Sequence, residues 1–197
     1  MMRSYAFRIE RSFIFPERVN SISLPIDMKT KNEKTLILAA YSIMAVLLFI
    51  LETVIPKPIP FLRIGLANVF ILLILVQLDL ISALAVTVGK VILGNLFSGL
   101  IFTPLILFSL VGSLLSLLTM WLVYRSSLPL SLIGISICGA VTHLFSQLVL
   151  GYFLFIQTPK IFSLIPLLLM IGLASGLITG ILAIVLFKNI RLSFDSR

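Results

Sequence analysis

Long apolar runs, separated by short polar or bend-forming segments, fill most of this chain. A helix needs about 20 predominantly apolar residues to cross the hydrocarbon core of a bilayer. Six runs approach or exceed that length, over residues 35–54, 64–78, 80–96, 104–124, 130–156 and 161–187. The second run is short, and we expect Arg63 to lengthen it by extending its side chain toward the interface. The pattern predicts an all-α, polytopic membrane protein with six transmembrane helices.

The breaks between the runs differ in sequence. Between the first and second runs, prolines at positions 56, 58 and 60 prevent a continuous helix and favour an extended strap. The remaining breaks are a tight turn at Asp79, an uncharged turn over residues 94–104, and loops over 125–129 and 157–160. The chain therefore divides into a polar amino-terminal arm (residues 1–34), a membrane domain (residues 35–187) and a basic tail (residues 188–197).

The polar arm has no apolar core of signal-peptide type before Thr35, so we expect no cleavable leader. Met28 is followed by a short basic stretch and then directly by the first apolar run, which is typical of the start of a bacterial membrane protein. Our hypothesis is that residues 1–27 are either a dispensable extension or are not translated, the true start being Met28. A truncation beginning at Met28 that failed to insert or function would refute it.

Composition agrees with a chain that lies in a lipid bilayer. Hydrophobic residues make up 60% of the sequence, charged residues 11%, and the mean hydropathy is +1.22, which is outside the range of soluble domains. The formal net charge of +8 does not indicate nucleic-acid binding, because the basic residues gather at the ends of apolar runs. A lone cysteine, Cys138, offers neither a disulfide framework nor a thiolate metal cluster. We expect no metal and no cofactor.

Basic residues are divided unequally between the two ends of the predicted helices. With six spans both termini lie on one side, and that side carries seven basic residues in the arm, Arg125 and three in the tail. The other side carries Lys57, Arg63 and Lys160. Basic residues favour the cytoplasmic side, so we expect both termini in the cytoplasm of a bacterium. The proline strap, the uncharged turn and the loop containing Lys160 then lie together on the outer face of the cytoplasmic membrane.

Lys90 stands alone midway along the third run, about 15 Å from its cytoplasmic end. A cation at that depth costs about 2.5–3.5 kcal/mol, so it must face the bundle interior, a cavity or a partner. One interpretation is an ion pair with Glu52, the carboxylate inside the first run, and the other is contact with the negative part of a ligand. Lys57 and Arg63 place two cations at the expected outer rim, where they could contact the same ligand or anchor in lipid headgroups.

His143 and Gln147 are four residues apart and share one face of the fifth predicted helix. A lone buried histidine more often makes an interhelical hydrogen bond than binds a ligand or acts as a base, and no second histidine or metal-ligand cluster accompanies it. Asn68 and Asn95, each near the outer end of its helix, add polar groups that could converge on the same cavity. Asn95 follows Lys90 by five residues, so both can face a cavity only if the helix ends or bends near the glycine before Asn95.

Gly172, Gly176 and Gly180 recur every four residues in the last run and form one smooth face. Such small-residue faces let helices pack closely in lipid, and we expect this face to pack within the monomer. Small residues are scattered more loosely along the first run, where a docking surface for another membrane subunit is an alternative.

Three stretches in order carry a family resemblance: residues 56–68, PKPIPFLRIGLAN, residues 89–99, GKVILGNLFSG, and residues 139–147, GAVTHLFSQ. Over about residues 33–187 the chain resembles the bacterial membrane family labelled Gx transporter or heptaprenyl diphosphate synthase component I. That family is similar to the substrate-binding S-components of energy-coupling factor (ECF) transporters. The resemblance implies a six-helix protein that binds a small molecule near its outer face and couples to a transmembrane partner and two cytoplasmic ATPases. Family members usually have arginine where this chain has Lys90, which keeps the charge but loses the planar fork.

The synthase label can be compared with the chemistry that the residues offer. Prenyl diphosphate elongation of the usual kind needs Mg²⁺ held by clustered aspartates, because metal must neutralise the departing diphosphate. The chain has three aspartates, which lie far apart in the sequence and outside the predicted spans: Asp27, Asp79 and Asp195. The chain also has no P-loop and no nucleophile with a convincing base. We therefore expect that this subunit is not an enzyme.

Two functions remain from the sequence. The first is transport, in which an S-component-like subunit binds a small anionic solute from the outer face, in a cavity lined by Lys57, Arg63, Asn68, Lys90, Asn95, His143 and Gln147. The second is a non-catalytic membrane partner in isoprenoid, quinone or extracellular electron-transfer metabolism, which binds a prenyl lipid among its leucine- and phenylalanine-rich helices. A co-purified water-soluble metabolite would favour the first and a prenyl lipid the second.

Overall fold

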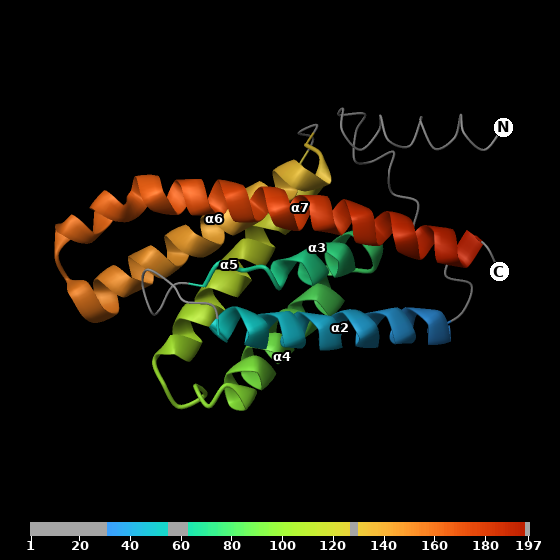
Figure 1. The fold of residues 1–197 in the computed structure, drawn as a ribbon, viewed down its shortest axis with the longest axis horizontal. Helices are drawn as coiled ribbons and strands as arrows, with labels where there is room; N and C mark the ends of the chain where they lie inside the picture. Colours follow the sequence, from blue (N-terminus) through green and yellow to red (C-terminus); the bar gives the residue numbers. More distant parts are fainter. Residues whose placement is uncertain (1–30, 55–62, 127–129, 196–197) are drawn as a thin grey trace.

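A computed structural model describes residues 31–54, 63–126 and 130–195, which form an all-helical bundle (Figure 1). Its elements, in chain order, are α2 (Lys31–Val54), α3 (Asn68–Gln77), α4 (Leu80–Phe97), α5 (Leu105–Arg125), α6 (Leu132–Gly151), the π-helical turn η2 (Tyr152–Ile156), the 3-10 helix η3 (Pro159–Leu164) and α7 (Ile165–Asp195). The predictions for Met28, for residues 1–27 and for Lys57 concern residues outside this described part of the chain.

Five of the helical segments are long and apolar enough to cross a membrane: 32–54, 80–97, 105–125, 132–156 and 159–188. The predicted all-α, membrane-type fold is thereby confirmed. The run predicted as a second span differs, because helix α3 begins only at Asn68 and has 10 residues, a length of about 15 Å. Gly65 adopts a φ of 85°, which interrupts helical geometry. Residues 63–67 therefore enter the bundle as a non-helical segment.

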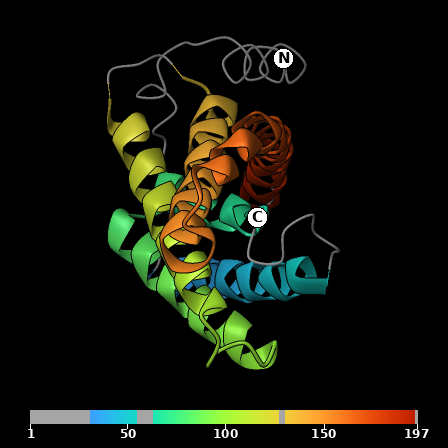
Figure 2. The ribbon, with the colours of Figure 1, turned by 90° about the vertical axis from the view of Figure 1, so that its left-hand side faces the viewer.

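Helix α3 lies at the centre of the bundle. In Figures 1 and 2, α6 and α7 run side by side on one side of it and α2 and α4 lie on the other. Helix α3 contacts all of these helices and α5 as well. Its apolar residues are buried around the whole circumference of the helix, as expected for a helix surrounded by others.

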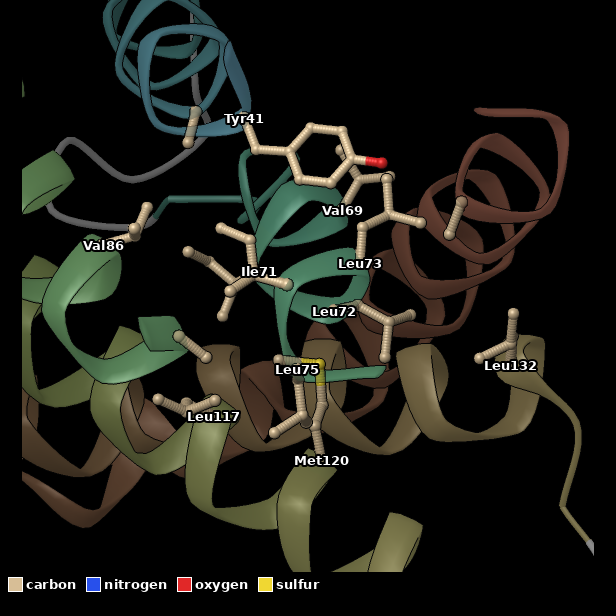
Figure 3. Packing of buried hydrophobic residues seen from close by; sticks show 14 of the residues in the cluster. Tyr41, Val69, Ile71, Leu72, Leu73, Leu75, Val86, Leu117, Met120 and Leu132 are labelled. Carbon is tan, nitrogen blue, oxygen red and sulfur yellow. The ribbon is translucent and has the colours of Figure 1, made fainter. Parts of the chain in front are cut away.

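The core around α3 is apolar and draws on every neighbouring helix (Figure 3). Figure 3 labels Tyr41, Val69, Ile71, Leu72, Leu73, Leu75, Val86, Leu117, Met120 and Leu132. Tyr41 of α2 also donates a hydrogen bond from its hydroxyl to Gln77 Oε1 at 3.1 Å. This packing fixes the depth of α3, and therefore the position of its amino-terminal end among the other helices.

Helices α6 and α7 approach each other along the glycine face of α7. A Cβ atom added at Gly176 would lie 2.5 Å from the Cα of Ile137, and one added at Gly180 would lie 2.7 Å from the Cα of Ile133. Gly172 faces Val141 in the same way, at 3.2 Å from its Cα. The glycine face therefore packs within the monomer, against the backbone of α6.

The connection between α6 and α7 bends at Gln157, which has a φ of 44°. The fifth predicted run thus ends as the π-helical turn η2, and the sixth begins two residues earlier than expected, with Pro159 in the first turn of η3. Proline suits a first helical turn because its φ is already helical and its missing N–H would have no partner there.

Candidate functional site

A buried polar cluster surrounds the amino-terminal end of α3, deep within the bundle. It contains the six predicted site residues that the structure describes: Arg63, Asn68, Lys90, Asn95, His143 and Gln147. Each is at most 8% exposed. The seventh predicted residue, Lys57, lies outside the described residues. Four elements supply this cluster, because the residues come from the segment before α3 and from α3, α4 and α6.

The α3–α4 hairpin brings Asn68 and Lys90 together. They lie eleven residues on either side of Asp79, so antiparallel helices place them at the same depth. Asp79 caps α4 by accepting a hydrogen bond from Ser82 N at 2.7 Å, which fixes the tight turn between the helices. At the other end of the hairpin, Lys90 Nζ donates to Asn68 Oδ1 at 2.5 Å. The ammonium group therefore points into the bundle, as its predicted cost in lipid requires.

Glu52 of α2 belongs to the same cluster and is 2% exposed. Its Oε1 accepts a hydrogen bond from the backbone N–H of Gly65 at 2.5 Å. Its charge also attracts both the Lys90 ammonium and the Arg63 guanidinium. Sequence reasoning considered Glu52 only as an ion-pair partner that would lock two helices, whereas its carboxylate also holds the non-helical segment in place.

Arg63 is buried inside the bundle and does not extend to the interface as predicted. Its Nη2 donates to Asn95 Oδ1 at 3.0 Å, and the guanidinium carbon lies 4.1 Å from the ring centroid of Phe49. Its backbone N–H donates to Gln147 Oε1 at 2.8 Å. The physical reason is the turn at Gly65, which directs the preceding residues inward, where an amide and an aromatic face offer partners for the cation.

Helix α4 continues past Gly94 to Phe97, and yet both Lys90 and Asn95 are buried. The helix therefore does not end at Gly94, and both side chains are buried without any need to face one shared cavity. The two side chains reach different partners: Lys90 contacts α3, whereas the long side chain of Arg63 reaches Asn95. Asn95 Nδ2 also donates to the carbonyl of Val91 at 2.7 Å, so its amide is held in one orientation.

His143 and Gln147 interact along one face of α6, with Gln147 Nε2 2.9 Å from His143 Nε2. Because Gln147 Oε1 accepts the Arg63 N–H, the other end of the amide is its NH₂ group, which donates. His143 Nε2 must then be the acceptor, and the neutral imidazole carries its hydrogen on Nδ1. That Nδ1 faces the backbone of Gly112 in α5 without a hydrogen bond of regular geometry.

Sequence reasoning missed three further residues of the site. Ser116 of α5 accepts a hydrogen bond from Asn68 Nδ2 at 3.3 Å. A Cβ atom added at Gly112 would lie 3.0 Å from both His143 and Gln147, so this glycine makes room for their side chains. Phe49 lies beneath the Arg63 guanidinium. The four-residue spacing of Gly112 and Ser116 was the available signal, since it places both on one face of a helix.

The cluster carries more positive than negative charge. Among the buried side chains of the described residues, Arg63 and Lys90 are the cations and Glu52 is the carboxylate. Arg63 Nη1 is buried and has no hydrogen-bond partner within the described part of the chain. No group of three or more potential metal ligands occurs in that part. This arrangement offers hydrogen-bond donors and a positive field, which suit an anion better than a metal ion.

Comparison with known proteins gives one family. Residues 41–186 match the family described as heptaprenyl diphosphate synthase component I. This range contains all the described site residues named above. No curated protein and no solved structure matched the chain.

Proposed function

This chain belongs to the heptaprenyl diphosphate synthase component I family, and we propose that it is a transport protein that binds a small anionic solute in the buried polar cluster. The solute enters from the outer face of the cytoplasmic membrane of a bacterium and is taken up into the cell. The protein performs no catalysis itself and requires no metal or cofactor.

The charge balance of the cluster carries this proposal. Two cations and one carboxylate leave a net charge of +1 at the centre of an apolar bundle. Buried charges that lack a counterion are costly in a medium of low dielectric constant. A bound anion would compensate the excess charge and accept hydrogen bonds from Lys90 Nζ and from the unpartnered Arg63 Nη1.

The proposed topology has six crossings, with both termini in the cytoplasm, in the manner of an S-component. The second crossing combines the half-length helix α3 with the non-helical segment before it. Irregular backbone at membrane depth is tolerated where it is buried in protein or lines a cavity. In many transporters, discontinuous helices of this kind end at the substrate site, near the middle of the membrane. Coupling to a transmembrane partner and two cytoplasmic ATPases is part of the proposal.

The description of the family favours a second candidate function. It names a component of a prenyl diphosphate synthase, so this chain would be a non-catalytic membrane partner that binds a prenyl lipid. The apolar surfaces of the helices are compatible with such a ligand. In this case the polar cluster would bind the headgroup of a lipid, and the bound molecule would be a lipid and not a water-soluble anion.

The molecule that co-purifies with the protein tests both candidates. The full chain is purified in a mild detergent, and bound molecules are identified by mass spectrometry. A water-soluble anion present in stoichiometric amounts supports uptake of a solute, and a prenyl lipid supports the second candidate. A neutral or cationic ligand would contradict the charge argument.

Substitution of Lys90 tests the site. We expect Lys90→Met to weaken binding of the co-purified anion at least about tenfold, because a desolvated charge contact is lost. Lys160→Met removes an exposed cation from η3 and should leave binding unchanged. Calorimetric titration measures the dissociation constants of both variants. Lys90→Arg keeps the charge, so retained affinity in this variant would show that the loss in Lys90→Met comes from the missing charge. Equal binding by Lys90→Met and Lys160→Met would overturn the assignment.

A further inference from the structure

We infer that Glu52 makes this anion site selective for singly charged oxyanions, such as monocarboxylates, over dianions. The inference rests on the proposed function, since it names the class of solute that the same cluster would accept. It assigns Glu52 a role as a specificity-determining residue.

The position of Glu52 supports this role. The carboxylate is 2% exposed. Its partner Gly65 lies two residues after Arg63 and accepts the N–H of Asn68, whose side chain contacts Lys90 Nζ, so Glu52 lies in the same cluster as both cations. It is also held in place, because Oε1 accepts the Gly65 N–H at 2.5 Å. A bound anion near the two cations would therefore experience the negative charge of Glu52 as well as the positive charges that attract it.

The buried charges determine which anion fits best. With a monoanion bound, the two cations, Glu52 and the ligand together have a net charge of zero. With a dianion bound, the same group carries one uncompensated negative charge inside an apolar bundle. Charge interactions over a few ångströms are several times stronger there than in water, so the repulsion between Glu52 and the second negative charge opposes binding of the dianion.

The available donors favour an oxyanion. The Lys90 ammonium has three N–H donors, one of which Asn68 accepts. Arg63 Nη1 is a second buried donor without a partner among the described residues. The planar guanidinium matches the geometry of a carboxylate, and a monocarboxylate supplies two acceptor oxygens for one negative charge.

Replacing the carboxylate by an amide tests the inference. Glu52→Gln keeps an acceptor for the Gly65 N–H and raises the net charge of the cluster from +1 to +2. Purified protein is titrated with two matched pairs of probes, benzoate with phthalate and butyrate with succinate, at constant ionic strength and at a pH where every carboxyl group is ionised. Asp79→Asn is the control, because it removes an exposed carboxylate and asparagine also caps helices well.

We expect the wild-type protein and Asp79→Asn to bind the monoanion of each pair more tightly than the dianion. In Glu52→Gln, the dissociation constant of the dianion divided by that of the monoanion should fall by about tenfold or more. A wild-type preference for dianions, or an unchanged ratio in Glu52→Gln, would overturn the inference and leave the proposed anion site standing. Failure of the wild-type protein to bind any of the four probes would count against the anion site itself, and the inference would fall with it.

Discussion

At the scale of single residues, the site depends on glycines that leave room for side chains from neighbouring helices. Gly94 is the tightest example, because a Cβ atom added there would overlap the ring of Phe49. The same ring supports the Arg63 guanidinium at 4.1 Å. Gly94, Phe49 and Arg63 thus form a stack from α4 through α2 to the segment before α3.

We expect Gly94→Ala to destabilise the protein by about 1–3 kcal/mol, the usual range for overpacking a filled interior. The displaced Phe49 ring would also move Arg63, so anion binding should weaken. Thermal unfolding in detergent and calorimetric titration measure the two effects.

Gly89→Ala in the same helix is the matched control. A Cβ atom added at Gly89 meets no atom within 4 Å, so this variant should be neutral or more stable by up to about 1 kcal/mol, because alanine favours a helix over glycine. Equal losses in both variants would show that the packing of Phe49 on Gly94 is not the cause.

The sequence predicted the burial of Lys90 well but not that of Arg63. A cation in the middle of an apolar run must face inward, whatever its partners. The position of Lys90 in its run was therefore sufficient to predict that its side chain is buried. Arg63 precedes an apolar run, where a long side chain usually extends to the interface. Only the positive φ at Gly65 turns the chain inward at that point, and the sequence does not show whether a glycine adopts such a conformation.

At the scale of helices, hydropathy located the ends of α2, α3, α4 and α5 to within four residues, whereas α7 extends eight residues beyond its predicted run. The difference that matters for the site is at α3, where the first four residues of the predicted run are not helical. A run of apolar residues predicts burial but not the point at which a helix starts. The length of α3 follows from tertiary contacts of the segment before it, in which Arg63 N and Gly65 N donate to side chains of α6 and α2. Those partners are distant in sequence, so no local pattern could have indicated them.

Packing of α7 on α6 gives a prediction at this scale. We expect Gly176→Ala to destabilise the protein by about 1–3 kcal/mol, because the added methyl group would meet the Cα of Ile137 at 2.5 Å and backbone atoms cannot rotate away. The midpoint of thermal unfolding in detergent measures this loss.

Gly134→Ala provides the comparison in α6. Its nearest contact is Leu130 Cδ2 at 3.3 Å, at the end of a flexible side chain. This variant should change stability by less than about 0.5 kcal/mol, as most substitutions away from tight packing do. If Gly176→Ala were equally mild, close approach of the two helices would not depend on the glycine face.

At the scale of the whole molecule, the helices place two sets of turns at opposite ends of the bundle. The proposed six-crossing topology assigns these two sets to opposite faces of the membrane. The turn after α4 and the bend between α6 and α7 lie toward the left in Figure 1, whereas the start of α2, the turn at Asp79 and the end of α7 lie toward the right. Basic residues are in excess at the right-hand ends in the sequence, and this excess predicts that those ends are cytoplasmic.

Cysteine labelling tests that orientation. In a Cys138→Ser background, we expect Ser163→Cys in η3 to react with a membrane-impermeant maleimide in intact cells, and Ser126→Cys after α5 to react only once the membrane is permeabilised. Both substitutions leave the distribution of basic residues unchanged and differ from serine by a single atom. The reverse labelling pattern would invert the topology and place the proposed entrance in the cytoplasm.

The peptide groups of Arg63 and Gly65 hydrogen-bond to side chains, Gln147 and Glu52, in place of the carbonyls of a helix. The side chain of Arg63 adds a contact with Asn95 and another with Phe49. These partners lie on three helices, α2, α4 and α6, so one short stretch of chain ties the three together. Loss of any one hydrogen-bond partner would leave a buried N–H group without an acceptor, and the effect would reach the proposed anion site from whichever helix was changed.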